Sequence, residues 1–135
     1  MKVGEDGNVN YSQDDDLSAQ FIEWTTNALV ELRQVMENLA DSATQDSEDV
    51  QRIYDLVHNI KGMGASFDFL LMTDIGTSLC GYIKSLDTNA EVKKRIFEAH
   101  VRALEVVHSN KITGSGGAQG KALTQRLTDI IHEES

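Results

Sequence analysis

The sequence predicts an all-α protein, an antiparallel up-down four-helix bundle with one additional helix. The chain has 135 residues and no Pro, which favours long uninterrupted helices, because Pro inside a helix removes a backbone hydrogen bond. About 40% of the residues are hydrophobic, enough for one core of ordinary size. Apolar residues recur at spacings of three and four in five segments with short connections between them, and short connections place neighbouring helices antiparallel.

The elements follow in chain order. Residues 1–16 are polar and acidic without periodicity, and we expect a flexible tail before a single helical domain over 17–135. The helices are expected over residues 17–40, 48–65, 70–86, 89–111 and 121–133.

Polar residues mark the ends of these helices. Asp46 or Ser47 can cap the second helix, and Thr88 or Asn89 the fourth, because their side-chain oxygens accept from free backbone N–H groups. The Gly-rich segment 113–120 has the composition of a flexible link. In the first helix we expect Trp24 and Val35 to lie in the core. No segment has the pattern of a strand.

The charge and the N-terminus narrow the class of protein. The formal net charge is −10, which disfavours binding to nucleic acid or to an anionic membrane surface. No apolar run approaches the ~18 residues of a transmembrane span, and the first residues lack the apolar core of a signal peptide. We therefore expect a cytoplasmic protein, and we expect it to be a monomer.

The sequence has no pattern for a metal or a nucleotide. Cys80 is the only cysteine, so neither an intrachain disulfide nor a cysteine cluster can form. His100, His108 and His132 are dispersed and lack the spacing of metal ligands. The run GSGGAQGKA lacks the spacing of a phosphate-binding loop. We expect no cofactor and no ATP-dependent kinase activity of its own.

The informative stretch surrounds His58. On a helical wheel of about 100° per residue, Val57 and Ile60 fall on the core side, and His58 lies roughly 140° from the centre of that side. It is therefore expected to face solvent. Lys61 is three residues on and Gly62 four, so both border the imidazole. Ala65 lies seven residues after His58 and Tyr54 four before it.

This arrangement suits phosphoryl transfer. A neutral imidazole has a free nitrogen lone pair near pH 7, and Lys61 can donate to phosphoryl oxygens. Gly62 and Ala65 leave room for a partner to close over the ring. However, a surface His on a helix usually has no special role. Two Gly inside a helix each cost about 1 kcal/mol, which favours function, but from spacing alone both interpretations stay open.

Residues 58–69, HNIKGMGASFDF, resemble the phosphoacceptor motif of histidine-phosphotransfer (HPt) domains, His-x-x-Lys-Gly followed by small residues. Residues 74–80 also look like those of stand-alone bacterial HPt proteins, and the resemblance covers about residues 17–133. One departure is Asp68, where the family usually has Gly. A positive φ is expected there, which Asp tolerates moderately well.

The resemblance implies a phosphorelay intermediate. His58 would be the phosphorylated residue, Lys61 the cation that stabilises the phosphoryl group, and Gly62 the small residue that gives access. Tyr54 and Ala65 would belong to the docking face. The partners would be receiver domains of hybrid histidine kinases and response regulators, and the receiver would supply Mg²⁺.

Two alternatives stay open at this point. One is a helical adaptor that binds a signalling partner through the same face without phosphorylation. The other is an acceptor domain from a larger histidine kinase. Acceptor domains of chemotaxis kinases carry acidic residues on the third helix, but no Glu lies between Phe69 and Leu86. By the resemblance, this absence favours exchange with a receiver aspartyl-phosphate.

Overall fold

The computed structural model describes residues 15–134, which form five α-helices and no strand. The predicted all-α class is therefore confirmed for this part of the chain. Residues 1–14 of the predicted tail lie outside the described residues, and Asp15 and Asp16 already belong to the first helix. The helices are α1 (Asp15–Glu37), α2 (Glu48–Ser66), α3 (Leu70–Ser85), α4 (Lys94–Ser109) and α5 (Gly117–Glu134).

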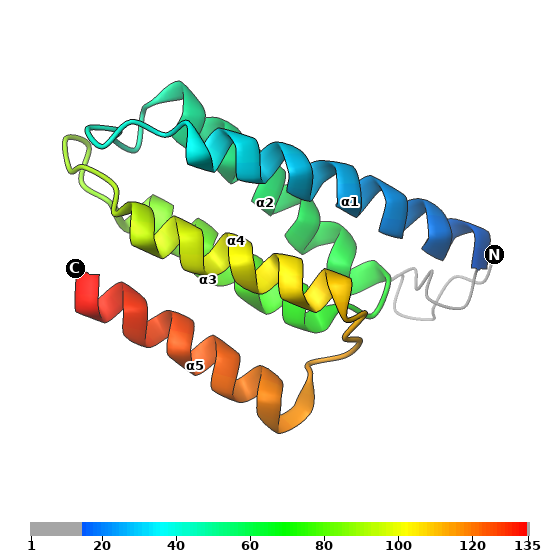
Figure 1. Cartoon of the computed structure of the whole chain (residues 1–135). Coiled ribbons are helices and arrows are strands. Elements are labelled where there is room, and N and C mark those ends of the chain that lie inside the picture. Colours follow the sequence, from blue (N-terminus) through cyan, green and yellow to red (C-terminus); the bar gives the residue numbers. More distant parts are fainter. Residues whose placement is uncertain (1–14, 135) are drawn as a thin grey trace, which may run out of the picture.

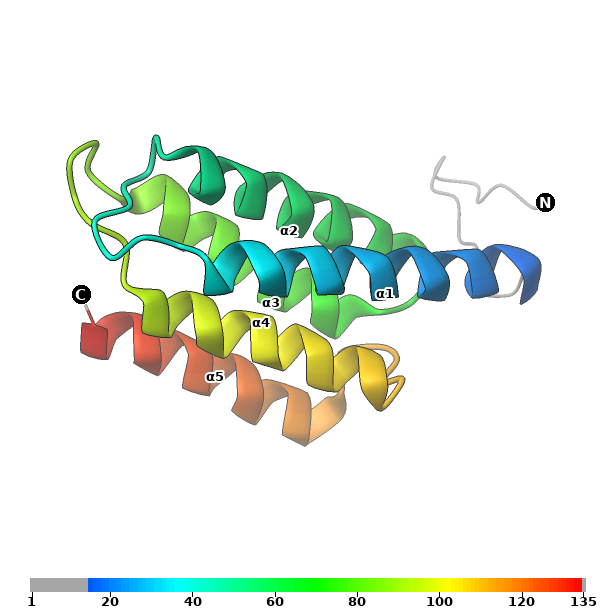
Figure 2. The same cartoon turned by 45° about the horizontal axis from the view of Figure 1, so that its top comes forward.

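The helices pack in a defined set of pairs. α1 and α3 each pack against both α2 and α4, while α5 packs against α3 and α4. In Figure 1, α5 lies along the side formed by α3 and α4, away from α1 and α2. Figure 2 shows α1 between α2 and α4, with α5 beyond α4. The contact between α2 and α3 (the α2–α3 seam) and the contact between α1 and α4 (the α1–α4 seam) therefore involve four different helices.

One apolar cluster holds these helices together. In α2, Val57 and Ile60 are completely buried, as the periodicity predicts. In α1 the prediction was partly wrong, because Trp24 and Val35 are only partly buried. Thr25 is buried in their place, and its hydroxyl donates to the Phe21 carbonyl at 2.7 Å. Because α1 packs against two helices, the face that it buries is rotated away from the line of large apolar residues that includes Trp24 and Val35.

The fourth helix begins later than predicted, at Lys94, and neither Thr88 nor Asn89 caps it. Tertiary hydrogen bonds hold the preceding residues extended. The Val92 N–H donates to the Ala43 carbonyl at 2.8 Å, and the Lys93 N–H donates to the Tyr82 hydroxyl at 3.0 Å. Val92 is buried there at 4% exposure. These partners are remote in sequence, so local capping signals gave the wrong start.

The segment 113–120, predicted as a flexible link, is shorter and partly helical, because α5 starts at Gly117. The first half of this segment is hydrogen-bonded to the turn between α2 and α3. The Gly114 N–H donates to the Asp68 carbonyl at 2.6 Å, and the Leu71 N–H donates to the Gly114 carbonyl at 2.9 Å. Asp68 has a φ of 63°, which confirms the positive φ expected where HPt domains have Gly.

The second helix begins as predicted, with Ser47 at the N-cap position. The Ser47 hydroxyl does not cap the helix, because it accepts from the Thr44 N–H at 2.9 Å in the preceding turn. Among the described helices, none is both long enough and apolar enough to cross a membrane.

Candidate functional site

The structure brings the predicted site residues together on the outer face of α2. His58, Gly62 and Ala65 are exposed. Lys61 and Tyr54 are partly buried at the edge of the same face. His58 faces away from the core because the buried residues of α2 occupy the other side of the helix, as the wheel predicts. Its imidazole ring stacks against the Tyr54 ring of the same helix.

Glycines fix how α3 lies against this part of α2. A Cβ at Gly76 would meet the Lys61 Cβ at 2.9 Å, and a Cβ at Gly64 would meet the Phe69 carbonyl at 3.0 Å. The Thr73 hydroxyl donates to the Lys61 carbonyl at 2.8 Å. The close packing of the two helices therefore holds the backbone of Lys61 in place. Sequence reasoning missed the role of Gly76.

Gly62 has a different reason to be small. A Cβ added there would meet nothing within 4 Å, so no packing requires glycine at this exposed position. Gly81 of α3 is equally exposed and equally free of neighbours. Each glycine costs about 1 kcal/mol of helix stability relative to Ala. Gly62 therefore leaves the surface beside His58 without a side chain.

Lys84 of α3 joins this face, and sequence reasoning missed it. Its Nζ lies 5.6 Å from the centre of the Tyr54 ring. The Tyr54 side chain is the main cause that raises the pKa of Lys84. Lys61 lies beside Gly76 while Tyr54 lies beside Lys84, so α2 and α3 run antiparallel. Gly81, one turn before Lys84, is thus level with His58.

The other ionisable groups lie in different surroundings. His100 is completely buried, and burial lowers its pKa. His108 contacts the Thr26 hydroxyl at 2.8 Å, whereas His132 is exposed on α5. Burial raises the pKa of the Cys80 thiol, while nearby Lys61 and Lys84 act in the opposite direction. In the described part of the chain, no group of three or more His, Cys, Asp or Glu could hold a metal ion.

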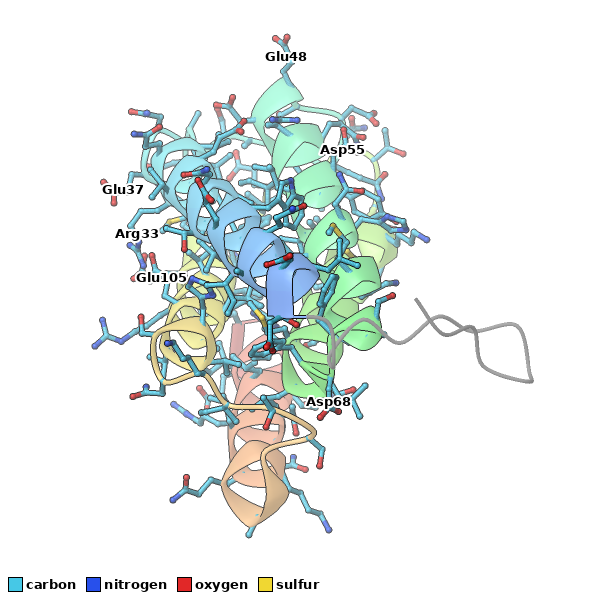
Figure 3. The ribbon with its side chains drawn as sticks, turned by 90° about the vertical axis from the view of Figure 1, so that its right-hand side faces the viewer. Arg33, Glu37, Glu48, Asp55, Asp68 and Glu105 are labelled. Carbon is cyan, nitrogen blue, oxygen red and sulfur yellow. The ribbon has the colours of Figure 1, made fainter. Side chains whose placement is uncertain are left out.

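A cavity of about 420 Å³ lies between α1 and α4, on the seam that does not include His58. Arg33 lines it and donates to both carboxylate oxygens of Glu105 at 2.7 Å. Figure 3 shows Arg33 and Glu105 on one side of the molecule and Asp55 of α2 on the other. Because Glu105 and Glu98 already pair with Arg33, the charge of this guanidinium is neutralised.

Comparison of the chain with protein-family models, curated proteins and solved structures gave no match. The chemistry of the face around His58 is therefore inferred from its own residues. It presents an accessible imidazole, a cation three residues away and no side chain at Gly62. Such a face can offer a nitrogen nucleophile to an electrophile carried by another molecule.

Proposed function

We propose that this chain is a phosphorelay intermediate of the HPt type. It would accept a phosphoryl group on His58 from the aspartyl-phosphate of a receiver domain and transfer it to an aspartate of a response regulator. The observation that carries this proposal is the exposed imidazole of His58, which stands beside Lys61 and the open position of Gly62. The resemblance of residues 58–69 to the HPt motif assigns the same three residues.

The helix packing supports the proposal. α1, α2, α3 and α4 contact one another in a closed ring of neighbours, and α5 adds to the outside of α3 and α4. We propose that this is the antiparallel up-down four-helix bundle with an additional helix, because closed rings of sequential helices are typical of bundles. Its rigid α2–α3 pair would present His58 without a flexible loop.

The chemical step needs little from this chain. The His58 lone pair would form the N–P bond as the P–O bond to the aspartyl oxygen breaks, and the bonding electrons leave with the carboxylate. The second ring nitrogen keeps its proton, so the reaction requires no general base. Lys61 would neutralise charge on the phosphoryl oxygens. The receiver would supply the aspartate and Mg²⁺, and this chain would act as a monomer without a cofactor.

The residues of α3 support a receiver domain as the source of the phosphoryl group. Cys80, next to Gly81 in α3, is only 4% exposed and is no base, and α3 contains no Glu. The one carboxylate of α3, Asp74, lies about two turns before Gly81, so no carboxylate of this helix lies level with His58 to orient the imidazole for attack on ATP. This supports exchange with a receiver domain over phosphorylation within a larger kinase, and it leaves ATP-dependent activity to another protein.

The test is site mapping by mass spectrometry after incubation with a phosphorylated receiver domain and Mg²⁺. We expect one phosphoryl group, on His58, that is labile in acid and stable in base. His58→Gln should abolish transfer while the fold is kept. Lys61→Ala should slow transfer without abolishing it, and Gly62→Gln should slow it by obstructing the partner.

His132→Gln is the matched control, because His132 is also exposed on a helix and should be dispensable. Phosphate on a residue other than His58, or undiminished transfer in His58→Gln, would contradict the proposal. Binding of the receiver without any transfer would favour the adaptor.

A further inference from the structure

Three side chains from two helices form a row on the α2–α3 face. The rings of Tyr54 and His58 stack with centroids 5.9 Å apart and planes inclined by 24°. On the α3 side, Lys84 Nζ lies 5.6 Å from the Tyr54 ring centre. Tyr54 therefore stands between the proposed nucleophile and a cation that no part of the HPt motif includes.

The row of Lys84, Tyr54 and His58 restricts the rotation of the His58 imidazole. An exposed His on a helix rotates about two side-chain bonds, and ordering a free side chain costs conformational entropy. A stacked aromatic neighbour favours one plane of the imidazole ring. Tyr54 can provide this only if its own ring is held, and Lys84 holds it from the neighbouring helix.

The position of Lys84 is fixed by helix packing. Gly76, two turns earlier on α3, lies so close to Lys61 that a Cβ would reach 2.9 Å. This contact sets the register of α3 against α2, and the register brings Lys84 level with Tyr54. The Tyr54 side chain raises the pKa of Lys84, which favours the charged ammonium beside the Tyr54 ring.

We propose that Tyr54 is a positioning residue for His58: held by Lys84, its ring fixes the plane of the imidazole so that the same ring nitrogen meets each phosphoryl donor. The inference rests on the proposed function and deepens it. The lone pair of an imidazole nitrogen lies in the ring plane, so the plane decides whether in-line attack on phosphorus is possible. Orientation of this kind contributes to the rate of transfer reactions.

The test uses the full chain and phosphoramidate, a small donor that needs no partner protein. The His58 nitrogen forms the N–P bond, the P–N bond of phosphoramidate breaks, and ammonia leaves. Nuclear magnetic resonance of the ¹⁵N-labelled imidazole reports which ring nitrogen carries phosphate. The chemical shifts of the ring protons report stacking on Tyr54 even when no phosphate is added.

Three variants separate the contributions. Tyr54→Leu removes the ring, Tyr54→Phe keeps the ring without the hydroxyl, and Lys84→Met keeps the stem without the charge. We expect wild-type protein to carry phosphate on one ring nitrogen. Tyr54→Leu should give a mixture of both isomers and a rate lower by roughly three- to tenfold. The isomer ratios and rates of Tyr54→Phe and Lys84→Met should lie between those of the wild type and Tyr54→Leu. The control Lys121→Met, at an exposed residue of α5, should match the wild type.

A double variant decides whether Lys84 acts through Tyr54. If it does, Lys84→Met should have no further effect in the Tyr54→Leu background, because the intermediary is gone. A full additional loss there would overturn the proposal and assign Lys84 directly to the phosphoryl group. Unchanged isomer ratio and rate in folded Tyr54→Leu would overturn it as well.

The outcomes for the two proposals are distinguishable. If His58 takes no phosphate from a receiver or from phosphoramidate, the proposed function fails. In that case the chemical shifts of the His58 ring protons still test the stacking on Tyr54, because they require no phosphorylation. Shifts that are the same in wild type and Tyr54→Leu would overturn the positioning role.

Discussion

Two histidines, in two regions of the molecule, show how surroundings decide chemistry. His58 stands on the open α2–α3 face with its ring against Tyr54. His100 is completely buried where α3 and α4 pack. Its Nδ1–H donates to the Ile96 carbonyl at 2.7 Å, and its Nε2 lies 2.9 Å from the Ser78 hydroxyl, which donates to it.

The difference teaches that residue type alone does not make a nucleophile. Both nitrogens of His100 are occupied by hydrogen bonds, and burial keeps the ring neutral by lowering its pKa. It has neither a free lone pair nor access for a donor. His58 has access because its helix buries the opposite face. His100 is therefore a buried polar residue with its hydrogen bonds made, whereas His58 on the α2–α3 face is accessible to another molecule.

The largest expected effect separates the two histidines by stability. His100→Ala should lower the free energy of unfolding by about 3 kcal/mol, because it opens a cavity and leaves the Ser78 hydroxyl without its partner. His58→Ala should change it by less than about 0.5 kcal/mol, since an exposed side chain leaves no cavity. Urea denaturation followed by circular dichroism measures both. Equal losses in the two variants would remove the contrast between face and interior.

The same contrast holds for two glycines near His58. Gly76→Ala should destabilise the fold by about 1–2 kcal/mol, because its Cβ would crowd Lys61 Cβ at 2.9 Å. Gly62→Ala should stabilise it by up to about 1 kcal/mol, because the Cβ enters open space and Ala is the better helix former. Thermal unfolding of the two variants provides the check. A loss of stability in Gly62→Ala would show that the face is more tightly packed than the structure indicates.

A smaller expected effect concerns the pH dependence of stability, and it tests the contrast between buried His100 and exposed His58. The pKa of His100 is lowered in the folded state, so the unfolded chain binds its proton first as the pH falls. The contribution of His100 is therefore fully present above its ordinary pKa of about 6.5 and is lost progressively below it. The free energy of unfolding should decrease with a slope of at most about 1.4 kcal/mol per pH unit for this group.

Chemical denaturation between about pH 7.5 and 5.5, around the ordinary His pKa, measures that slope. His100→Gln should flatten it, because an amide does not titrate. Burial lowers the pKa of His108 in the same direction, so a residual slope is expected in the variant. An unchanged slope in His100→Gln would mean that His100 does not gain a proton on unfolding.

Prediction from the sequence failed where remote contacts decide local structure. The start of α4 was placed at Thr88 or Asn89, whereas these residues form a turn, the Val92 N–H donates to the Ala43 carbonyl, and the helix begins only at Lys94. The link before α5 was expected to be flexible, yet Gly114 is bonded to the α2–α3 turn. Both errors have one cause, because the partners lie tens of residues away and leave no local pattern.

Local patterns in the sequence predicted five helices and the exposure of His58, because side-chain periodicity is a local property of the chain. The positive φ at Asp68 was expected from the resemblance to HPt domains. Only the tertiary structure decided which residues of different helices meet. The approach of Gly76 to Lys61, the row from Lys84 through Tyr54 to His58, and the burial of His100 against Ser78 all depend on the register between helices. That register is set by packing of the whole core, so no single segment encodes it.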